Sequence, residues 1–104
     1  MKSLKIVVAD DEPLLVEELT AYLTDAGHEV EASAASGTEL VSKTLELRPD
    51  LIVTDIKMPD MDGLEAIQRI NAKFAVPAII ISAYHDQAFI DRAMEEAVMA
   101  YMVK

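Results

Sequence analysis

Short apolar runs alternate with helical periods along the whole chain. Residues 6–9, 51–54 and 78–81 form nearly continuous apolar runs. Such runs are typical of strands that are buried on both faces of a parallel sheet. Residues 29–33 alternate polar and apolar side chains, as an edge strand does, and residues 100–103 form a fifth run. The pattern therefore predicts five strands.

The segments between these runs have helical spacing. The first helix is expected to begin near Pro13 and to stop at Gly27. Its predicted inward face consists of Leu15, Leu19, Tyr22, Leu23 and Ala26. Ser36 and Glu39 have the spacing of a capping box, which predicts the start of a second helix that ends before Pro49.

Two more helices are predicted in the second half of the chain. The third opens after Gly63, and its inward residues are Leu64, Ile67, Asn71 and Phe74. The fourth begins near Asp86, with a buried stripe made of Phe89, Ala93 and Ala97 or of Ile90 and Met94.

The alternation of strands and helices predicts one α/β domain over residues 1–104. We expect a flavodoxin-like, doubly wound, five-stranded parallel sheet with the strand order 2-1-3-4-5. The sequence stops at Lys104, at the end of the fifth predicted strand. A helix would be the natural next element, so we expect a C-terminally truncated domain that lacks its last helix. Self-association through the uncovered edge would follow.

Composition narrows the possible partners. The 104 residues include 19 acidic and 9 basic ones, for a formal net charge of −10. This balance argues against direct nucleic-acid binding and against anionic membrane surfaces. The chain has no cysteine, no apolar run that could span a bilayer and no secretory signal. A soluble cytoplasmic protein is expected.

Acidic side chains follow two strands that are neighbours in the predicted sheet. Asp10 and Asp11 come after the first strand and Asp55 after the third, while Ser82 and Lys104 end the fourth and fifth. The carboxyl ends of parallel strands meet at one edge, so three carboxylates are expected to converge there. They would repel one another unless a cation lay between them, and an all-oxygen site selects magnesium, manganese or calcium over zinc.

Four segments in this order resemble the motifs of the response-regulator receiver family: residues 7–13, 54–63, 81–83 and 101–104. Residues 82–87 and 99–104 are also similar to receivers attached to RNA-binding antiterminator (ANTAR-type) domains. The resemblance implies a phosphorylation switch that works with a histidine kinase. It also implies an output domain or partner that contacts the face formed by the fourth helix and fifth strand.

The resemblance implies a role for each residue of the edge. Asp55 would accept the phosphoryl group, assisted by Ser82 and Lys104. A Mg²⁺ ion, with Mn²⁺ as a substitute, would be held by Asp11, Asp55 and the backbone carbonyl of Lys57, with Asp10 acting directly or through water. Ser82 and Tyr101 would form the switch.

Other functions remain as alternatives. The chain could be the N-terminal part of a transcription regulator, with any nucleic-acid contact beyond Lys104. A flavin enzyme would need a phosphate-binding loop where residues 10–12 are acidic, and an Asp-x-Asp phosphatase would need a second Asp at position 57. Asp60 and Asp62 fail the spacing of a calcium loop and are expected to form a turn and a helix cap. His28 and His85 are interpreted as surface loop residues.

Overall fold

The computed structural model describes residues 2–83, 88, 90, 91, 95 and 98–103. Its parallel strands form one sheet with the order β2-β1-β3-β4-β5. The elements are β1 (Lys5–Ala9), α1 (Pro13–Asp25), β2 (Glu29–Ala34), α2 (Gly37–Leu47), β3 (Leu51–Thr54), α3 (Gly63–Asn71), β4 (Ala78–Ser82) and β5 (Val98–Val103). The predicted doubly wound, flavodoxin-like sheet is confirmed.

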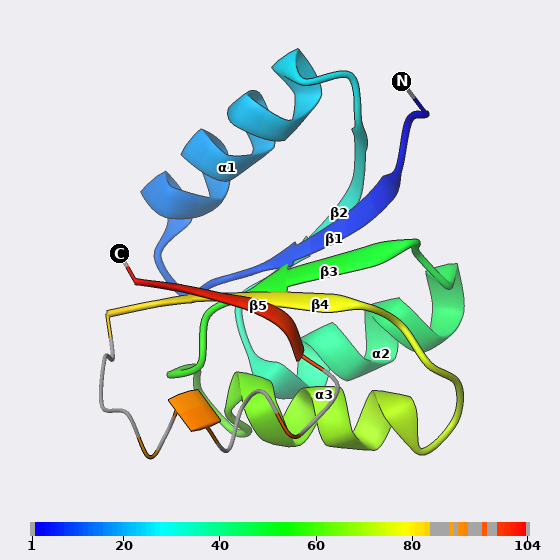
Figure 1. The fold of residues 1–104 in the computed structure, drawn as a ribbon. Helices are drawn as coiled ribbons and strands as arrows, with labels where there is room; N and C mark the ends of the chain where they lie inside the picture. The colour runs from blue at the N-terminus through cyan, green and yellow to red at the C-terminus, as the bar shows by residue number, and fades with distance from the viewer. Residues whose placement is uncertain (1, 84–87, 89, 92–94, 96–97, 104) are drawn as a thin grey trace.

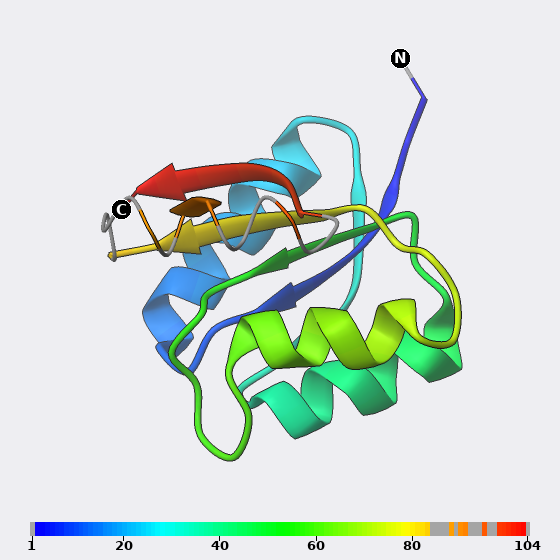
Figure 2. The same ribbon diagram turned by 60° about the horizontal axis from the view of Figure 1, so that its bottom comes forward.

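The helices lie on both faces of the sheet. Helix α1 covers one face and α2 and α3 cover the other (Figures 1 and 2). Along β1, Val7 and Ala9 pack into the core under α2 and α3, whereas Ile6 and Val8 pack into the core on the α1 face. All four are buried. Both faces of the central strands are therefore covered, which explains their continuous apolar runs.

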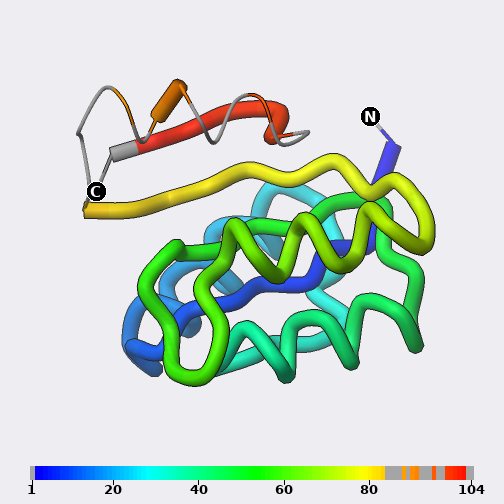
Figure 3. The backbone as a smooth tube through the Cα atoms, turned by 90° about the horizontal axis from the view of Figure 1, so that it is seen from below, coloured from blue at the N-terminus to red at the C-terminus, as the bar shows by residue number. Residues whose placement is uncertain are grey.

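Side-chain caps begin the two helices that lie side by side on one face (Figure 3). The Ser36 hydroxyl accepts a hydrogen bond from the Glu39 N–H at 3.1 Å, and the Asp62 carboxylate accepts one from the Glu65 N–H at 2.8 Å. The Glu39 carboxylate accepts a hydrogen bond from the Ala35 N–H at 2.7 Å. In a capping box it would accept from the N–H of the cap residue, Ser36, instead. The predicted starts of α2 and α3 are confirmed, with this one difference.

Helix α1 ends as predicted, but its inward face is narrower than predicted. Gly27 follows it with φ 95°, a conformation that favours glycine. The helix contacts the sheet through Val16, Leu19 and Leu23, whereas Tyr22 and Ala26 are exposed. Among the described elements α1 is the only helix on this face. No described helix packs against its flanks, and the prediction that Tyr22 and Ala26 face inward is wrong.

The buried residues of α3 lie closer to the middle of the helix than the sequence predicted. Leu64 and Ile67 are buried as predicted, and Ala66 and Ile70 are buried with them. Asn71, the last residue of the helix, is only half-buried, and its side-chain oxygen accepts from the Val76 N–H at 3.3 Å. Phe74 lies beyond the end of the helix, but it packs against the core as predicted. It is half-buried, and its ring lies under the Arg48 guanidinium at 4.8 Å. The sequence pattern ran past the end of this helix.

The predicted fourth helix falls largely on residues about which the structure makes no statement. Asp86, Phe89, Ala93, Met94 and Ala97 lie outside the described residues. Strand β5 starts at Val98, two residues before its predicted start. Within the described residues, no helix has both the length and the apolar character needed to cross a membrane.

The α1 face of the sheet is less completely covered than the opposite face. Ile79 and Ile81 of β4 are half-buried there, and Met102 of β5, the register partner of Ile81, is 55% exposed. On α1 itself, Leu14 and Tyr22 are 74% and 73% exposed. Self-association of the 104-residue chain through this face stays a prediction.

Two fully buried threonines differ in their hydrogen bonding. The Thr44 hydroxyl in α2 has no hydrogen-bond partner among the described residues, whereas the Thr54 hydroxyl at the end of β3 donates to the Asp55 carbonyl at 2.8 Å. An unpaired buried hydroxyl costs free energy that an apolar group of the same shape does not. We expect Thr44→Val to raise the free energy of unfolding by about 1 kcal/mol and Thr54→Val to lower it by about 1 kcal/mol. Urea denaturation measures the free energy of unfolding of both variants. If both substitutions change it in the same direction and by the same amount, the hydrogen-bond assignment is contradicted.

Candidate functional site

The strand ends bring the predicted acidic residues to one edge of the sheet. Ala9 and Thr54, the last residues of β1 and β3, are register partners. The Asp55 N–H donates to the Ala9 carbonyl at 2.9 Å, which continues the pairing by one residue. Asp10 and Asp55 therefore follow directly from neighbouring strands, as the sequence predicted.

Three carboxylates converge at this edge. One oxygen each from Asp10, Asp11 and Asp55 lies within 4.8 Å of the other two. Asp10 and Asp55 are buried, with 3% and 7% of their surface exposed, whereas Asp11 is exposed. The cluster thus combines two carboxylates inside the protein with one that faces solvent.

Backbone hydrogen bonds orient the two buried carboxylates. Asp10 accepts from the Glu12 N–H at 2.9 Å, in the turn that leads into α1. Asp55 accepts from the Ile56 N–H at 2.7 Å, in the turn that follows β3. These backbone donors give both carboxylates a defined direction.

We call residues 56–62 the acceptor loop, because they follow Asp55, the predicted acceptor of the phosphoryl group. The Gly63 N–H donates to the Ile56 carbonyl at 2.7 Å and closes the loop. A tight bend at Asp60, with φ 70°, is accompanied by a 2.8 Å hydrogen bond from the Met61 N–H to the Pro59 carbonyl. Lys57 is exposed, two residues after Asp55.

The other predicted site residues come from β4 and β5. Ser82, the last residue of β4, is 1% exposed. Tyr101 in β5 is half-buried, packs against the core under α2 and α3, and is the register partner of Ile80. Lys104 lies outside the described residues.

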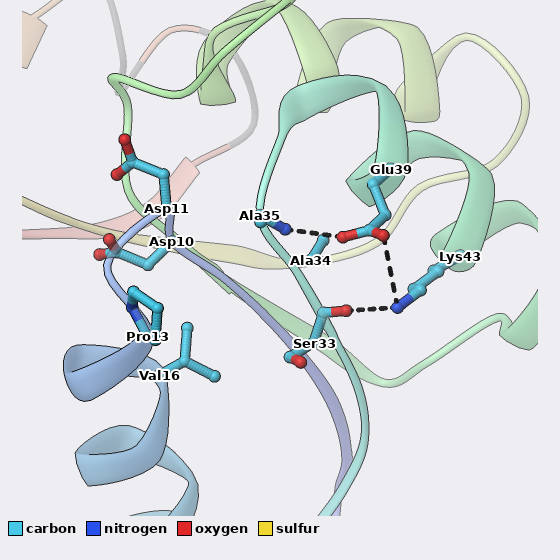
Figure 4. Close-up of a pocket in the computed structure, with 9 residues that line it drawn as sticks. All are labelled: Asp10, Asp11, Pro13, Val16, Ser33, Ala34, Ala35, Glu39 and Lys43. Carbon is cyan, nitrogen blue, oxygen red and sulfur yellow. Dashed lines mark hydrogen bonds and ion pairs between the residues drawn. The ribbon is translucent and has the colours of Figure 1, made fainter.

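A cavity of about 350 Å³ lies beside the carboxylates, between the start of α1 and the β2–α2 connection. Its lining comprises Asp10, Asp11, Pro13, Val16, Ser33, Ala34, Ala35, Glu39 and Lys43 (Figure 4). The Lys43 ammonium donates to the Ser33 carbonyl at 2.5 Å and lies 3.8 Å from the Glu39 carboxylate. In Figure 4 the side chains of Asp10 and Asp11 point away from this ion pair. No pattern in the sequence indicated this cavity, because it forms between segments that are far apart in the sequence.

Two residues that were candidates for other sites have structural roles. The Asp62 carboxylate caps α3, which confirms the prediction of a turn and a cap at residues 60–62. His28 is half-buried, and its Nδ1 accepts a hydrogen bond from the Leu4 N–H at 3.1 Å. His28 lies in the loop before β2, as predicted, but it is only partly exposed because it connects the start of β2 to the segment before β1. His85 lies outside the described residues.

The comparisons with known proteins agree with this geometry. The model of the response regulator receiver domain family matches residues 6–104. The chain belongs to this family. A receiver domain is a phospho-accepting regulatory domain of two-component signalling, and not an enzyme in the usual sense.

Two relatives and one solved structure show how far the similarity extends. The transcriptional regulatory protein PdtaR of Mycobacterium tuberculosis is 33% identical over 96% of this chain, which spans 49% of PdtaR. The chemotaxis protein CheY of Thermotoga maritima is 35% identical over 96% of this chain and 84% of CheY. One chain in the crystal structure of the CheX–CheY–BeF3–Mg complex of Borrelia burgdorferi superposes on this chain with a TM-score of 0.92 at 27% identity. The match covers 96% of this chain and 77% of that chain. This receiver domain thus spans about half the length of PdtaR.

The donors of the acidic cluster suit a hard divalent cation. All are carboxylate oxygens, and the chain has no cysteine that could provide a thiolate. Oxygen ligands favour magnesium, manganese or calcium over zinc. Two carboxylates inside the protein that lie near a third are also costly without a compensating charge. The residues of this receiver domain therefore fit such an ion.

Proposed function

We propose that this receiver domain accepts a phosphoryl group on Asp55 from the phosphohistidine of a histidine kinase. A carboxylate oxygen of Asp55 attacks phosphorus, and the phosphorus–nitrogen bond of phosphohistidine breaks. Its electron pair stays on the ring nitrogen, and the ring takes up one proton from solvent to become imidazole. The products are an aspartyl phosphate and an unphosphorylated kinase histidine. The observation that carries the proposal is the placement of Asp55 beside Asp10 and Asp11 at the carboxyl edge of the sheet.

We propose Mg²⁺ as the ion of the acidic cluster, with Mn²⁺ as a substitute. Asp11, Asp55 and the backbone carbonyl of Lys57 would hold it, with Asp10 acting directly or through water. When bound, the ion compensates negative charge on the phosphoryl oxygens. The exposed position of Asp11 supports the assignment, because Mg²⁺ keeps several waters when it binds to proteins.

The residues of β4 and β5 have proposed roles around the phosphoryl group. The Ser82 hydroxyl donates a hydrogen bond to one phosphoryl oxygen, and the Lys104 ammonium lies against another. Movement of Ser82 toward that group leaves space behind it, which the ring of Tyr101 fills. The half-buried position of Tyr101 on the strand next to Ser82 supports this switch role.

The partners follow from the same proposal. The phosphorylated state would reach an output domain or a downstream protein through the face of the predicted fourth helix and β5, in the cytoplasm. The likeness to PdtaR supports transcription regulation as the output, with an RNA-binding antiterminator domain as the specific candidate. With a net charge of −10, residues 1–104 would not contact the nucleic acid themselves.

Removing the exposed carboxylate tests the metal assignment. In Asp11→Ala, the Mg²⁺ concentration for half-maximal labelling by acetyl phosphate is expected to rise at least about tenfold, because changes near a bound metal cost about 10–100-fold in affinity. Thermal stability should be unchanged or slightly higher, since Asp11 is exposed and lies near two other carboxylates.

Asp25→Ala is the matched control for this experiment. It removes the same charge from the last residue of α1, far along the chain from the strand ends that form the site. Its magnesium titration should match that of the wild-type chain. If Asp11→Ala and Asp25→Ala have the same titration curve, Asp11 is not a metal ligand.

A further inference from the structure

Gly37, the first residue of α2, lies directly against the acceptor loop. A Cβ atom at position 37 would overlap the carbonyl oxygen of Met61 and would lie 2.6 Å from the Met61 carbonyl carbon. It would also lie 2.7 Å from the Met61 Cβ. The first two of these atoms belong to the backbone, so no side-chain rotation could make room. Any residue other than glycine must push the loop and the helix apart.

Further contacts show that Gly37 meets the acceptor loop at its bend. The Gly37 N–H donates to the Pro59 carbonyl at 3.4 Å, and the same carbonyl accepts from the Met61 N–H at 2.8 Å. The bend itself is at Asp60, where φ is 70°. The Ser36 cap holds the first turn of α2, which therefore presents a fixed surface to the loop.

The acceptor loop is held on its other side by α3. The Gly63 N–H bonds to the Ile56 carbonyl, and a Cβ at Gly63 would overlap the Asp55 carbonyl oxygen. The loop between these points is short, so a displacement at Met61 must be taken up within a few residues. Lys57 lies among them, two residues after Asp55.

We propose that Gly37 is a positioning residue of the phosphorylation site. By lacking a side chain, it lets the first turn of α2 set the position of residues 57–61 relative to Asp55. The inference rests on the proposed function in that it concerns the loop that would provide the Lys57 carbonyl to the metal. It adds a contact from α2, an element that contributes no side chain to the acidic cluster.

Gly37→Ala tests the proposal, with Gly27→Ala as its matched control. Gly27 has φ 95°, and a Cβ atom added there would meet no atom within 4 Å, so its substitution strains the backbone without touching the loop. Both variants should lose stability. Only Gly37→Ala should weaken Mg²⁺ binding and slow labelling by acetyl phosphate, by on the order of 10–100-fold, as expected for small misplacements of a reacting group.

Magnesium binding is measured by calorimetry without a phosphodonor, so it does not depend on phosphorylation. Equal magnesium affinity in Gly37→Ala and the wild-type chain would overturn the inference. A wild-type chain that takes no label, together with weaker magnesium binding in Gly37→Ala, would overturn the proposed function and support the inference.

A measurement on the wild-type chain covers the case in which Gly37→Ala does not fold. The backbone amide resonance of Gly37 should shift when Mg²⁺ and beryllofluoride are added, because its N–H faces the Pro59 carbonyl. The Gly27 amide, which bonds to the Thr24 carbonyl, should not shift. A Gly37 resonance that stays unchanged at saturating ligand would contradict the coupling.

Discussion

The Asp55→Asn variant is expected to take up no phosphoryl group from acetyl phosphate or from a phosphorylated kinase. The amide is close in shape to the carboxylate, and its oxygen can still accept the 2.7 Å hydrogen bond from the Ile56 N–H. It carries no charge and is a poor nucleophile, so the variant should fold and yet lack the reactive group. Intact-protein mass measurement after incubation with Mg²⁺ and acetyl phosphate gives the result.

Asp60→Asn is the matched control, since it makes the same chemical change in the same loop. Asp60 is exposed and has φ 70°, a conformation that asparagine adopts readily. It should be labelled as the wild-type chain is. Labelling of Asp55→Asn at the same level as Asp60→Asn would remove Asp55 from the role of acceptor.

Gly63→Ala is expected to lower the stability of the domain strongly. Its Cβ would overlap the Asp55 carbonyl oxygen and would lie 3.2 Å from the Asp55 carbonyl carbon and 3.3 Å from the Ile56 Cα. These are backbone atoms between the sheet and α3, and they have little room to move. Overpacking of a closely packed interior costs about 1–3 kcal/mol, and we expect about 3 kcal/mol here.

Urea denaturation measures this loss. A substitution at Gly27, where only the positive φ is strained, should cost about 1–2 kcal/mol. A loss at Gly63 no greater than that at Gly27 would show that the turn after Asp55 can move. The contact would then not explain why glycine occupies position 63.

Much of the fold could be predicted because buried parallel strands have a simple pattern. The apolar runs at residues 6–9 and 51–54 are buried on both faces of the sheet, and the run at 78–81 is buried on one face and half-buried on the other. Helix faces were predicted less well. Tyr22 has the correct spacing but lies on a flank of α1 where no described helix packs, and Phe74 lies beyond the end of α3. The spacing of apolar residues alone does not show where a helix ends or which of its flanks a neighbouring helix covers.

The acidic edge could be predicted for a related reason. The position of Asp10, Asp11 and Asp55 depends on strand ends and strand order, which the hydrophobic pattern predicts. The cavity beside Lys43 and the approach of Gly37 to Met61 could not be predicted. Each depends on the distance between elements that are far apart in the sequence, and that distance is set by packing.

Mapping the labelled residue tests the central claim most directly. The wild-type chain is incubated with acetyl phosphate and Mg²⁺, the acyl phosphate is trapped by borohydride reduction, and peptides are sequenced by mass spectrometry. We predict that the modification lies on Asp55 and that chelation of Mg²⁺ prevents it. Modification at any other residue with Asp55 unmodified, or no modification at all in the presence of Mg²⁺, would contradict the account.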